Sequence, residues 1–407
     1  MAPHFASGFD FTDPELWERR SPVAEFAELR RTAPVWWNAQ PDETSGGFRD
    51  GGYWVVSRHE DVKEISRNSE RYSAQRKGAI IRLPNDTTPE QMELTGALLV
   101  NMDPPKHSTI RRIVSKGFTP RAVEGLRAAL TERAARIVHE ATRSGSGDFV
   151  QQVACELPLQ AIAELLGVPE ADRRKLFDWS NSTLNYDDPE YGDPTAAFAE
   201  IIGYAWNMAE QRRAHPVGDI VSTLVHAGLD GEALGSDEFG FFVVLLAIAG
   251  NETTRNAITH GMKAFVDHPE QWELFRAERP RTTADEVVRW ATPVNAFQRT
   301  ATEDLEIGGA HVRAGQRLGL FYSSANFDES AFTDPFAFDI RRDPNPHVGF
   351  GGTGAHYCVG ANLARLEIDL MLNAIADAMP ALTELAPPVR LRSGWINGIK
   401  SWQVRYG

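Results

Sequence analysis

The stretch HVGFGGTGAHYCVGANLAR, residues 347–365, joins a glycine-rich loop to an apolar run with helical spacing. Cys358 lies in the loop, just before the predicted helix. The dipole and unpaired N–H groups of a helix N-terminus favour a thiolate over a thiol. Such a thiolate is a soft ligand suited to iron, and glycines let the chain pass close to a flat group. The alternative is a buried cysteine beside a flexible loop. The glycines on both sides of Cys358, and His356 two residues before it, favour iron binding.

The composition indicates a chain with a sizeable core and an acidic surface. Of its 407 residues 42% are hydrophobic, and 42 basic against 56 acidic residues give a net charge of −14. This charge argues against nucleic acid or an anionic membrane as a general partner. The two cysteines, Cys155 and Cys358, make no disulfide framework and suit a reducing cytosol. Cys155 lies in an apolar segment and is expected in the core.

Neither a targeting segment nor a membrane span is apparent. The first eight residues lack the basic and apolar regions of a signal peptide, and the longest apolar run, residues 241–249, is too short to span a bilayer. No repeat or low-complexity linker divides the chain, so we expect residues 1–407 to form one domain. These features predict a soluble, cytoplasmic protein that does not span the membrane.

A second unusual stretch lies in the middle of the chain. Residues 238–265 predict one helix of about 40 Å, apolar on nearly all sides in its first half. Inside it, AGNETT at residues 249–254 places a glycine, an acid and two hydroxyl groups at mid-helix. The glycine costs about 1 kcal/mol relative to alanine, and a hydroxyl can bond the preceding turn. Such local violations often mark functional sites. The alternative is a kinked core helix with a capped acid.

Two further helices carry charged pairs. His107 and Arg111 are four residues apart and share a helix face, which could contact a cofactor carboxylate or remain a solvated basic face. Glu286 and Arg289 are three residues apart on another predicted helix. If that pair lay on the surface, it would contribute little to stability.

The cysteine loop resembles the haem-binding loop of the cytochromes P450. The family pattern is Phe, Gly, any residue, Gly, any residue, His or Arg, any residue, Cys, any residue, Gly, and Gly354, His356, Cys358 and Gly360 match it. Phe350 lies one residue further from the cysteine than the pattern expects, which leaves open whether its ring packs near the sulfur. The resemblance covers essentially the whole chain. It implies a mainly α fold with small β-sheets, the triangular single-domain cytochrome P450 fold with a long central helix over the haem.

The resemblance also implies roles for individual residues. Cys358 would be the thiolate ligand of haem b, and Gly250 would leave room for O₂ beside it. Glu252 and Thr253 match the acid–alcohol pair that delivers protons when O₂ is cleaved in a dry pocket. The haem propionates would be held by His107, Arg111, Arg299 and His356, with His347 as a further candidate. Glu286 and Arg289 would join Arg342 in a buried network that fixes the segment before the cysteine loop.

Several stretches are similar to the steroid side-chain 26-monooxygenases of actinobacteria, namely residues 8–11, 33–38, 249–260, 347–365 and 394–400. Those enzymes hydroxylate the terminal methyl group (C26/C27) of a cholesterol or cholestenone side chain and can oxidise it onward to the acid. The candidate pocket residues are mostly apolar, as a sterol requires, and are Ile80, Ile81, Leu83, Leu98, Val244, Ala247, Ala249, Val294, Phe297 and Trp395. A branched fatty acid or a terpenoid would suit them almost as well.

The resemblance implies an electron donor outside the chain, because no flavin or nicotinamide domain fits inside it. We expect a ferredoxin and its ferredoxin reductase. A local basic patch could bind an acidic ferredoxin, and its members would be Lys106, Arg112, Lys116, Arg121 and Arg341. The alternative is a scattered set of solvated side chains.

Three other classes of protein share some of these features. One is a haem-binding sensor or carrier without oxygenase turnover, and another is a peroxide-driven oxygenase. Glu252 and Thr253 argue against both. The third is an enzyme with a cysteine nucleophile and no haem, which a thiolate-type CO spectrum would exclude.

Overall fold

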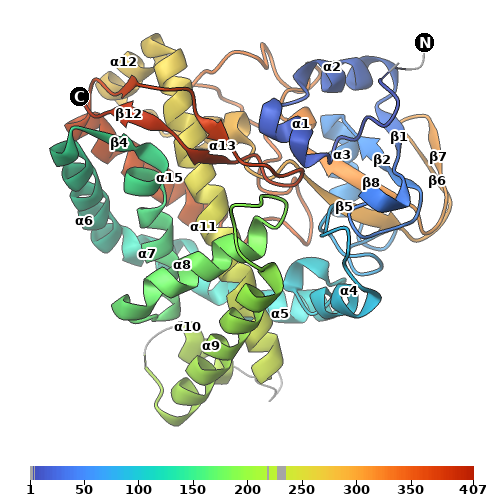
Figure 1. Ribbon diagram of the computed structural model, residues 1–407, viewed down its shortest axis with the longest axis horizontal. Coiled ribbons are helices and arrows are strands. Elements are labelled where there is room, and N and C mark those ends of the chain that lie inside the picture. The colour runs from blue at the N-terminus through green and yellow to red at the C-terminus, as the bar shows by residue number, and fades with distance from the viewer. Residues whose placement is uncertain (1–2, 4, 218–219, 227–234) are drawn as a thin grey trace.

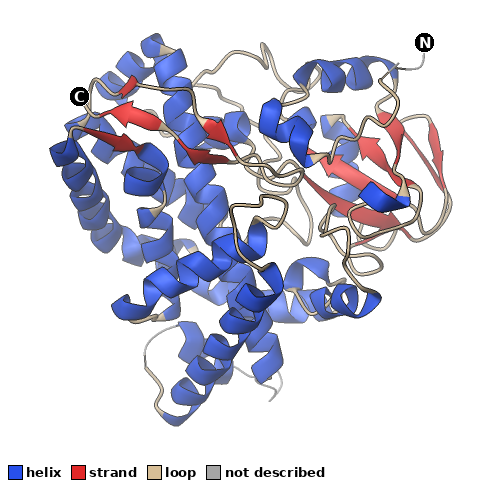
Figure 2. Ribbon diagram, in the orientation of Figure 1, coloured by secondary structure: helices blue, strands red, loops and turns tan. Residues whose placement is uncertain are grey.

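Helices make up most of the described chain, and short strands gather in small sheets (Figure 1, Figure 2). The computed structural model describes residues 3, 5–217, 220–226 and 235–407. The longer helices are α6 (Pro120–Ser144), α7 (Glu156–Leu166), α8 (Glu170–Leu184), α9 (Pro194–Ala214), α11 (Ser236–Asp267) and α15 (Ala361–Ala378). The others are α1 (Pro14–Arg19), α2 (Val23–Thr32), α3 (His59–Arg67), α4 (Pro89–Thr95), α5 (Lys106–Val114), α10 (Ile220–His226), α12 (Pro269–Glu278), α13 (Thr283–Ala291) and α14 (Tyr322–Ala325). The prediction of a mainly α fold with small β-sheets is confirmed.

Helix α11 runs through the middle of the molecule, where α7, α8, α9, α13 and α15 pack against it (Figure 1). At its start the Glu238 carboxylate accepts a hydrogen bond from the N–H group of Gly235 at 3.3 Å, and Pro269 follows its end. Phe239 and Val243 are fully buried, as a helix that is apolar on nearly all sides requires. The prediction of one long helix over residues 238–265 is confirmed.

The largest sheet has five strands in the order β1-β2-β8-β5-β3. Its strands are β1 (Val35–Ala39), β2 (Gly52–Val56), β3 (Tyr72–Ser73), β5 (Ala296–Ala301) and β8 (Arg317–Phe321). β2 pairs with β8 in parallel, and the other neighbours are antiparallel. Every residue of β8 is buried, because both faces of the sheet are covered. The neighbouring β5 carries Arg299 opposite Leu318 and so fixes the position of that arginine.

Three smaller sheets complete the fold. β6 (Leu305–Ile307) pairs with β7 (Ala310–Val312), and β10 (Val389–Arg390) pairs with β11 (Ile399–Ser401). The third sheet has the order β4-β12-β9, with β4 (Ser146–Asp148), β12 (Gln403–Arg405) and β9 (Thr383–Glu384). It brings the C-terminal segment beside the segment that follows α6.

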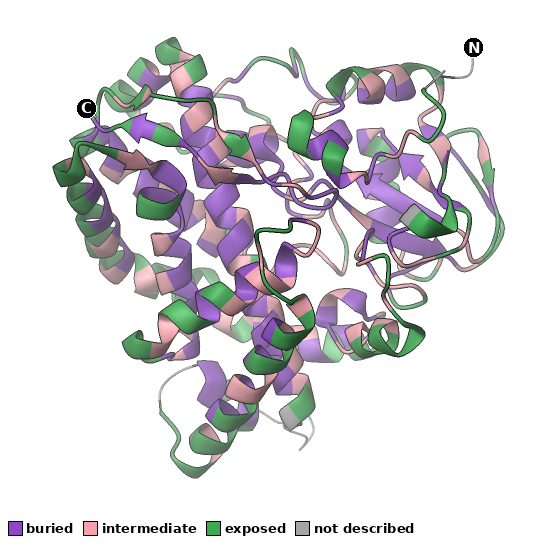
Figure 3. Ribbon diagram, in the orientation of Figure 1, coloured by how far each residue is buried: buried purple, intermediate pink, exposed green. Residues whose placement is uncertain are grey.

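Burial is concentrated around α11 and across the five-stranded sheet, while the outer faces of α6, α8 and α9 are exposed (Figure 3). One hydrophobic cluster surrounds α11 and α15, and a second lies under the sheet. A third joins the N-terminal aromatic residues Phe11 and Trp17 to the segment around Trp395. Cys155 is buried, as the sequence predicts.

The predicted long loop over residues 70–104 contains a helix that was not predicted from the sequence. Helix α4 begins after Thr88, whose hydroxyl group accepts a hydrogen bond from the N–H group of Gln91 at 3.2 Å. The Gln91 side chain in turn accepts from the N–H group of Thr88 at 2.9 Å. This reciprocal capping compensates for the weak apolar periodicity of the segment.

Candidate active site

The cysteine loop approaches the N-terminus of α15 as the sequence predicts. Gly360 caps the helix, and Cys358 lies two residues before that cap. The N–H group of Cys358 donates to the carbonyl oxygen of Phe350 at 2.9 Å. Phe350 therefore stays next to the cysteine despite the extra residue in the loop, and both residues line the same cavity. The guanidinium group of Arg365 also lies over the Phe350 ring, with its Cζ atom 4.5 Å from the ring centroid.

Close packing against α3 explains one glycine of this loop. Gly354 has a φ of +94°, and a Cβ atom there would lie 2.2 Å from the carbonyl oxygen of Ser66. Any larger residue would push the loop away from α3 and move Cys358 with it. The requirement for glycine here comes from the neighbouring helix as well as from the loop conformation.

Burial dominates the electrostatics of the cysteine. It raises the pKa of the Cys358 thiol, and the N–H group of Gly360 together with Arg111 and Arg365 offsets only part of that rise. The N–H group at the helix terminus lowers the pKa of the thiol, as predicted, but burial raises that pKa by more. A cation at the sulfur would supply the remaining stabilisation.

The centre of α11 forms the opposite wall of the cavity. Ala249, Gly250 and Thr253 line it, and the hydroxyl group of Thr253 donates to the carbonyl oxygen of Ala249 at 2.6 Å. A Cβ atom on Gly250 would lie 2.4 Å from Cδ1 of Ile162 in α7. The missing side chain at Gly250 therefore also accommodates α7, and the expectation that Gly250 leaves room for O₂ stays a prediction.

Glu252 lies in α11 but faces away from the cavity. Its side chain is 2% exposed and pairs with the guanidinium group of Arg255. The same carboxylate oxygen, Oε1, accepts from the amide of Asn256 at 2.9 Å, whereas Oε2 has no partner among the described residues. The carboxylate is thus held from one side and left with one free acceptor.

A cluster of donors comprises three residues that line the cavity, His107, Arg111 and His356, and Arg299 on β5. The His107 and His356 rings are 4.2 Å apart, and Nδ1 of His107 and Nε2 of His356 are buried without partners. Arg299 is buried, and its Nη1 atom donates to the carbonyl oxygen of Gln298 at 2.7 Å. Arg111 donates to the carbonyl oxygen of Tyr357 at 2.5 Å. Burial, with Arg299, His107 and Arg111 nearby, lowers the pKa of His356 to about 2. An anion placed here would relieve this repulsion.

The cavity and these donors fit the haem that the resemblance implies. The sulfur of Cys358 lies on one wall, Thr253 on the other, and His107 and Arg111 also reach the lining. None of the carboxylates in the described chain forms an ion pair with Arg299, His107 or His356, so two propionate groups would supply the missing charge. The described residues contain no group of three His, Cys, Asp or Glu side chains that could hold a metal by themselves. An iron with one cysteine ligand would bring its other ligands with it.

Seven of the ten predicted pocket residues line this cavity, which has a volume of about 700 Å³. They are Ile80, Leu83, Leu98, Ala249, Val294, Phe297 and Trp395. The three others are predicted wrongly. Ile81 points toward the sheet, where its Cδ1 atom would lie 2.5 Å from a Cβ on Gly319, because neighbours in an extended chain face opposite sides. Val244 and Ala247 lie in the core around α11, on a different face from Thr253.

Most of the cavity wall consists of residues that were not predicted from the sequence. Residues one and two turns before Ala249 on the same helix face line it, and these are Phe242, Leu245 and Leu246. Counting back from Thr253 in steps of three and four would have found them. Leu94, Leu184 and Phe198 come from three other helices, and their part in the cavity depends on tertiary packing.

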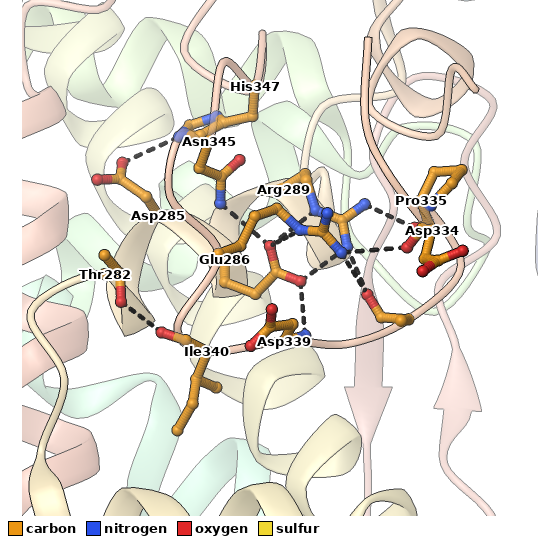
Figure 4. A network of polar contacts seen from close by, with 12 residues as sticks. Thr282, Asp285, Glu286, Arg289, Asp334, Pro335, Asp339, Ile340, Asn345 and His347 are labelled. Carbon is orange, nitrogen blue, oxygen red and sulfur yellow. Dashed lines mark hydrogen bonds and ion pairs between the residues drawn. The ribbon is translucent and has the colours of Figure 1, made fainter. Parts of the chain in front are cut away.

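The pair Glu286 and Arg289 is fully buried and joins Arg342 (Figure 4). Nη2 and Nε of Arg289 donate to the two carboxylate oxygens of Glu286, each at 2.8 Å. Nε of Arg342 donates to Oε2 at 3.2 Å, and the N–H group of Asp339 to Oε1 at 2.9 Å. The network ties α13 to the segment that leads into the cysteine loop.

His347 does not reach the cavity, so its assignment as a further propionate partner is wrong. Its Nε2 atom lies 2.9 Å from the carboxylate of Asp285 (Figure 4). Nε of Arg365 donates to the same oxygen at 2.7 Å. Asp285 on α13 therefore holds the His347 ring toward that helix.

The predicted basic patch is smaller than expected. Arg341 pairs with Glu278, and Lys106 lies 3.8 Å from Glu238. Arg112, Lys116 and Arg121 are exposed on α5, on the turn after it and at the start of α6. None of these three forms an ion pair with another described residue.

None of the described helices combines the length and the apolar character that crossing a membrane requires.

Comparisons with known proteins agree with this geometry. Residues 150–376 match the family model "Cytochrome P450". The chain is 63% identical over 405 residues to a steroid C26-monooxygenase of Rhodococcus jostii, covering 99% of this chain and 86% of the relative. It is 42% identical over 394 residues to a methyl-branched lipid omega-hydroxylase of Mycobacterium tuberculosis, covering 94% and 90%.

A solved structure shows the same fold. A Mycobacterium marinum cytochrome P450 in complex with pseudoionone superposes with a TM-score of 0.90 at 35% identity, and all of both chains is covered. The fold, the family match and the full-length relatives lead to one conclusion: the chain belongs to the cytochrome P450 family.

Proposed function

We propose that this protein hydroxylates the terminal methyl group (C26/C27) of a cholesterol or cholestenone side chain, and that it can oxidise the product onward to the acid. As a cytochrome P450 it is a monooxygenase with haem b as its cofactor, bound through a cysteine thiolate. The observation that carries the substrate assignment is the 63% identity to a steroid C26-monooxygenase over nearly the whole chain. The mostly apolar cavity of about 700 Å³ supports it.

When bound, the haem supplies activation of O₂ at its iron. We propose that Cys358 is its thiolate ligand, because the other cysteine, Cys155, is buried in a separate cluster and hydrogen-bonds to Gln151. We propose that His107, Arg111, Arg299 and His356 bind the propionate groups, since they form a cluster of donors that no acid of the described residues pairs with. The structural network of Glu286, Arg289 and Arg342 would hold the cysteine loop in register beneath them.

We propose that Glu252 and Thr253 deliver protons into the cavity. The apolar wall and a bound sterol exclude water from the reacting end, so protons have to pass through the chain. Thr253 lines the cavity, and Glu252 is the residue before it in α11. Oε2 of Glu252 has no hydrogen-bond partner among the described residues. An acid that takes a proton from water and a hydroxyl group that passes it inward match this arrangement.

A methyl-branched lipid is the second candidate substrate. The 42% identity to a methyl-branched lipid omega-hydroxylase favours it, and both reactions oxidise a terminal carbon of a branched chain. Titration of the purified haem protein with cholest-4-en-3-one separates the two. The steroid assignment predicts a shift of the haem spin state with that ligand. No shift with it, and a shift with a methyl-branched fatty acid, would instead support the lipid assignment.

We further propose that electrons come from a ferredoxin, itself reduced by a ferredoxin reductase, and that the protein works in the cytoplasm. The exposed side chains of Arg112, Lys116 and Arg121 are the candidate contact. Reversal of these three charges should abolish the salt dependence of the reduction rate. An unchanged salt dependence would place the donor elsewhere.

A further inference from the structure

The acid of the proposed proton pair is isolated from the cavity mouth. Glu252 and Arg255 are 2% and 1% exposed, and the walls between the mouth and Thr253 are mainly apolar. With a sterol in the cavity, no water column reaches Glu252 from that side. Protons therefore need an entrance on the other side of α11.

Unpartnered polar atoms mark that side. Oε2 of Glu252 and Nε of Arg255 are buried without a hydrogen-bond partner among the described residues. Nη1 of Arg255 donates to the Asn181 side chain on α8 at 3.3 Å, which directs the guanidinium group toward the end of that helix. Both side-chain polar atoms of Asn185, one turn further on, are also buried and unpartnered. Buried polar atoms without a protein partner are usually satisfied by ordered water.

Tyr191 lies in the loop that continues from Asn185, because the N–H group of Asp188 donates to the carbonyl oxygen of Asn185 at 3.0 Å and that of Tyr191 to the carbonyl oxygen of Asp188 at 3.2 Å. It belongs to the loop between α8 and α9 and is half-buried, and its hydroxyl group has no hydrogen-bond partner in the described chain. Burial raises its pKa, Arg255 and Lys400 lower it, and Glu252 and Asp188 raise it. The charges of Glu252, Arg255, Asp188 and Lys400 therefore all act on the Tyr191 phenol.

The outer end of this series reaches solvent. Nζ of Lys400 lies 3.2 Å from the buried Asp188 carboxylate and 2.7 Å from the carboxylate of Glu190, which is exposed. The N–H group of Tyr191 donates to the carbonyl oxygen of Asp188 at 3.2 Å, so the loop holds these residues together. Cys155 faces Arg255 as well, but burial raises its pKa to about 11, and its thiol donates to Gln151.

We propose that Asp188, Lys400 and Tyr191 form the proton entrance to Glu252, with ordered water between the phenol and the free Oε2 atom. In each transfer one proton enters from solvent at the Asp188–Lys400 pair. Tyr191 passes its hydroxyl proton inward and takes the new one, and Glu252 receives one proton. No electrons move and no other bond changes. The proposal rests on the proposed role of Glu252 and extends it to residues outside the cavity.

The test compares the holoenzyme with Tyr191→Phe and with a matched control, Tyr204→Phe. The Tyr204 hydroxyl group bonds to Asp172 on the outer side of α8 and α9, away from the series. Tyr191→Phe should keep the haem content and the spin-state shift, slow turnover on the order of tenfold and raise the solvent deuterium isotope effect. A role in structure alone would leave that isotope effect unchanged. Turnover and isotope effect within twofold of Tyr204→Phe would overturn the proposal.

Two further measurements keep the result decisive. Asp188→Asn retains the side-chain shape, and it should slow turnover in the same way if Tyr191→Phe does not fold. A crystal structure of the holoenzyme should show ordered water between the Tyr191 hydroxyl group and Oε2 of Glu252, and a dry apolar contact there would contradict the route. Glu252→Gln distinguishes a failure of the proposed proton entrance from a failure of the proposed role of Glu252. If it slows turnover while both other variants do not, only the entrance is wrong, and if it has no effect, the proposed role of Glu252 is wrong as well.

Discussion

Arg82 and Asp187 form an ion pair that joins two loops at the mouth of the cavity. Nε of Arg82 lies 3.2 Å from the Asp187 carboxylate, and the two side chains are only 7% and 10% exposed. Arg82 precedes α4, and Asp187 follows α8. The hydroxyl group of Tyr186 adds a hydrogen bond to the carbonyl oxygen of Arg82 at 2.5 Å. Leu83 and Tyr186, next to the paired residues, line the cavity, so we expect the pair to hold this side of the cavity mouth closed.

Removing one charge of this pair should loosen the mouth. Asp187→Asn leaves Arg82 buried beside an uncharged amide, which costs about 3 kcal/mol of the free energy of unfolding. The two loops would separate more often, so an apolar ligand should enter and leave faster. Stopped-flow measurement of the haem spin-state change gives both rate constants, and urea unfolding gives the stability.

Asp178→Asn is the control for that variant. Its carboxylate pairs with Arg174 on the surface of α8, with side chains 58% and 72% exposed, so it should change stability by less than about 1 kcal/mol. If Asp187→Asn exchanged ligand at the wild-type rates, the ion pair would not hold the mouth closed.

The network around Glu286 should be necessary for folding. Glu286→Gln would leave Arg289 and Arg342 without their shared carboxylate in a site that solvent does not reach. We expect a loss of about 3–5 kcal/mol and a preparation with little bound haem. Denaturant unfolding and haem content measure the two effects. Glu270→Gln, which removes an exposed partner of His268, should change neither. Equal stability of the two variants would show that the network is dispensable.

His260 should make the protein sensitive to mild acid. Its Nε2 atom hydrogen-bonds to the carbonyl oxygen of Asn397 at 3.1 Å, and burial, reinforced by Arg390, lowers its pKa from 6.5 to about 3. Below pH 6.5 the unfolded chain therefore binds a proton that the folded chain does not, so stability falls as the pH falls from 6.5 toward 3. Between pH 7 and pH 5 the loss is at most about 2 kcal/mol.

His260→Gln keeps a donor for Asn397 and cannot titrate, so it should lose less stability than the wild type between pH 7 and pH 5. Urea unfolding at both pH values gives the difference. His311→Gln, on the exposed face of β7, should behave like the wild type. If His260→Gln lost as much stability between pH 7 and pH 5 as the wild type, His260 would not be the source of the acid sensitivity.

Thr253→Ala should separate electron use from product formation. The variant loses the only hydroxyl group of the proposed pair but keeps Cys358 and the propionate donors, so it should bind haem and substrate normally. Without controlled proton delivery, more of the NAD(P)H oxidised should end as hydrogen peroxide. Thr259→Ala is the control, because Thr259 also bonds four residues back along α11 but lies outside the cavity lining. Unchanged coupling in Thr253→Ala would refute the role of the hydroxyl group.

Local patterns in the sequence were enough to place the main elements of the site. The apolar run after Cys358 gave helix α15, and the long apolar segment around Gly250 gave α11 with Thr253 on the cavity side. Helix α4 was missed although Thr88 and Gln91 have the spacing of a capping box. Capping hydrogen bonds there replace the apolar periodicity on which the prediction relied.

Tertiary contacts decided the rest. Ile80 lines the cavity and Ile81 does not, because the extended segment packs one residue against the sheet and turns its neighbour the other way. His347 was a further candidate for a propionate contact but hydrogen-bonds to Asp285 on α13 instead. The pairing of Arg82 with Asp187 joins residues 105 positions apart, which periodicity within one element cannot predict.

Product identification after turnover tests the central claim most directly. The holoenzyme, a ferredoxin, its reductase and NAD(P)H are supplied under ¹⁸O₂ with an equimolar mixture of cholest-4-en-3-one and a methyl-branched fatty acid. Mass spectrometry then locates the incorporated oxygen. The proposed function predicts ¹⁸O at the terminal methyl carbon of the steroid side chain. Oxidation of the fatty acid alone, with the steroid recovered unchanged, would contradict it.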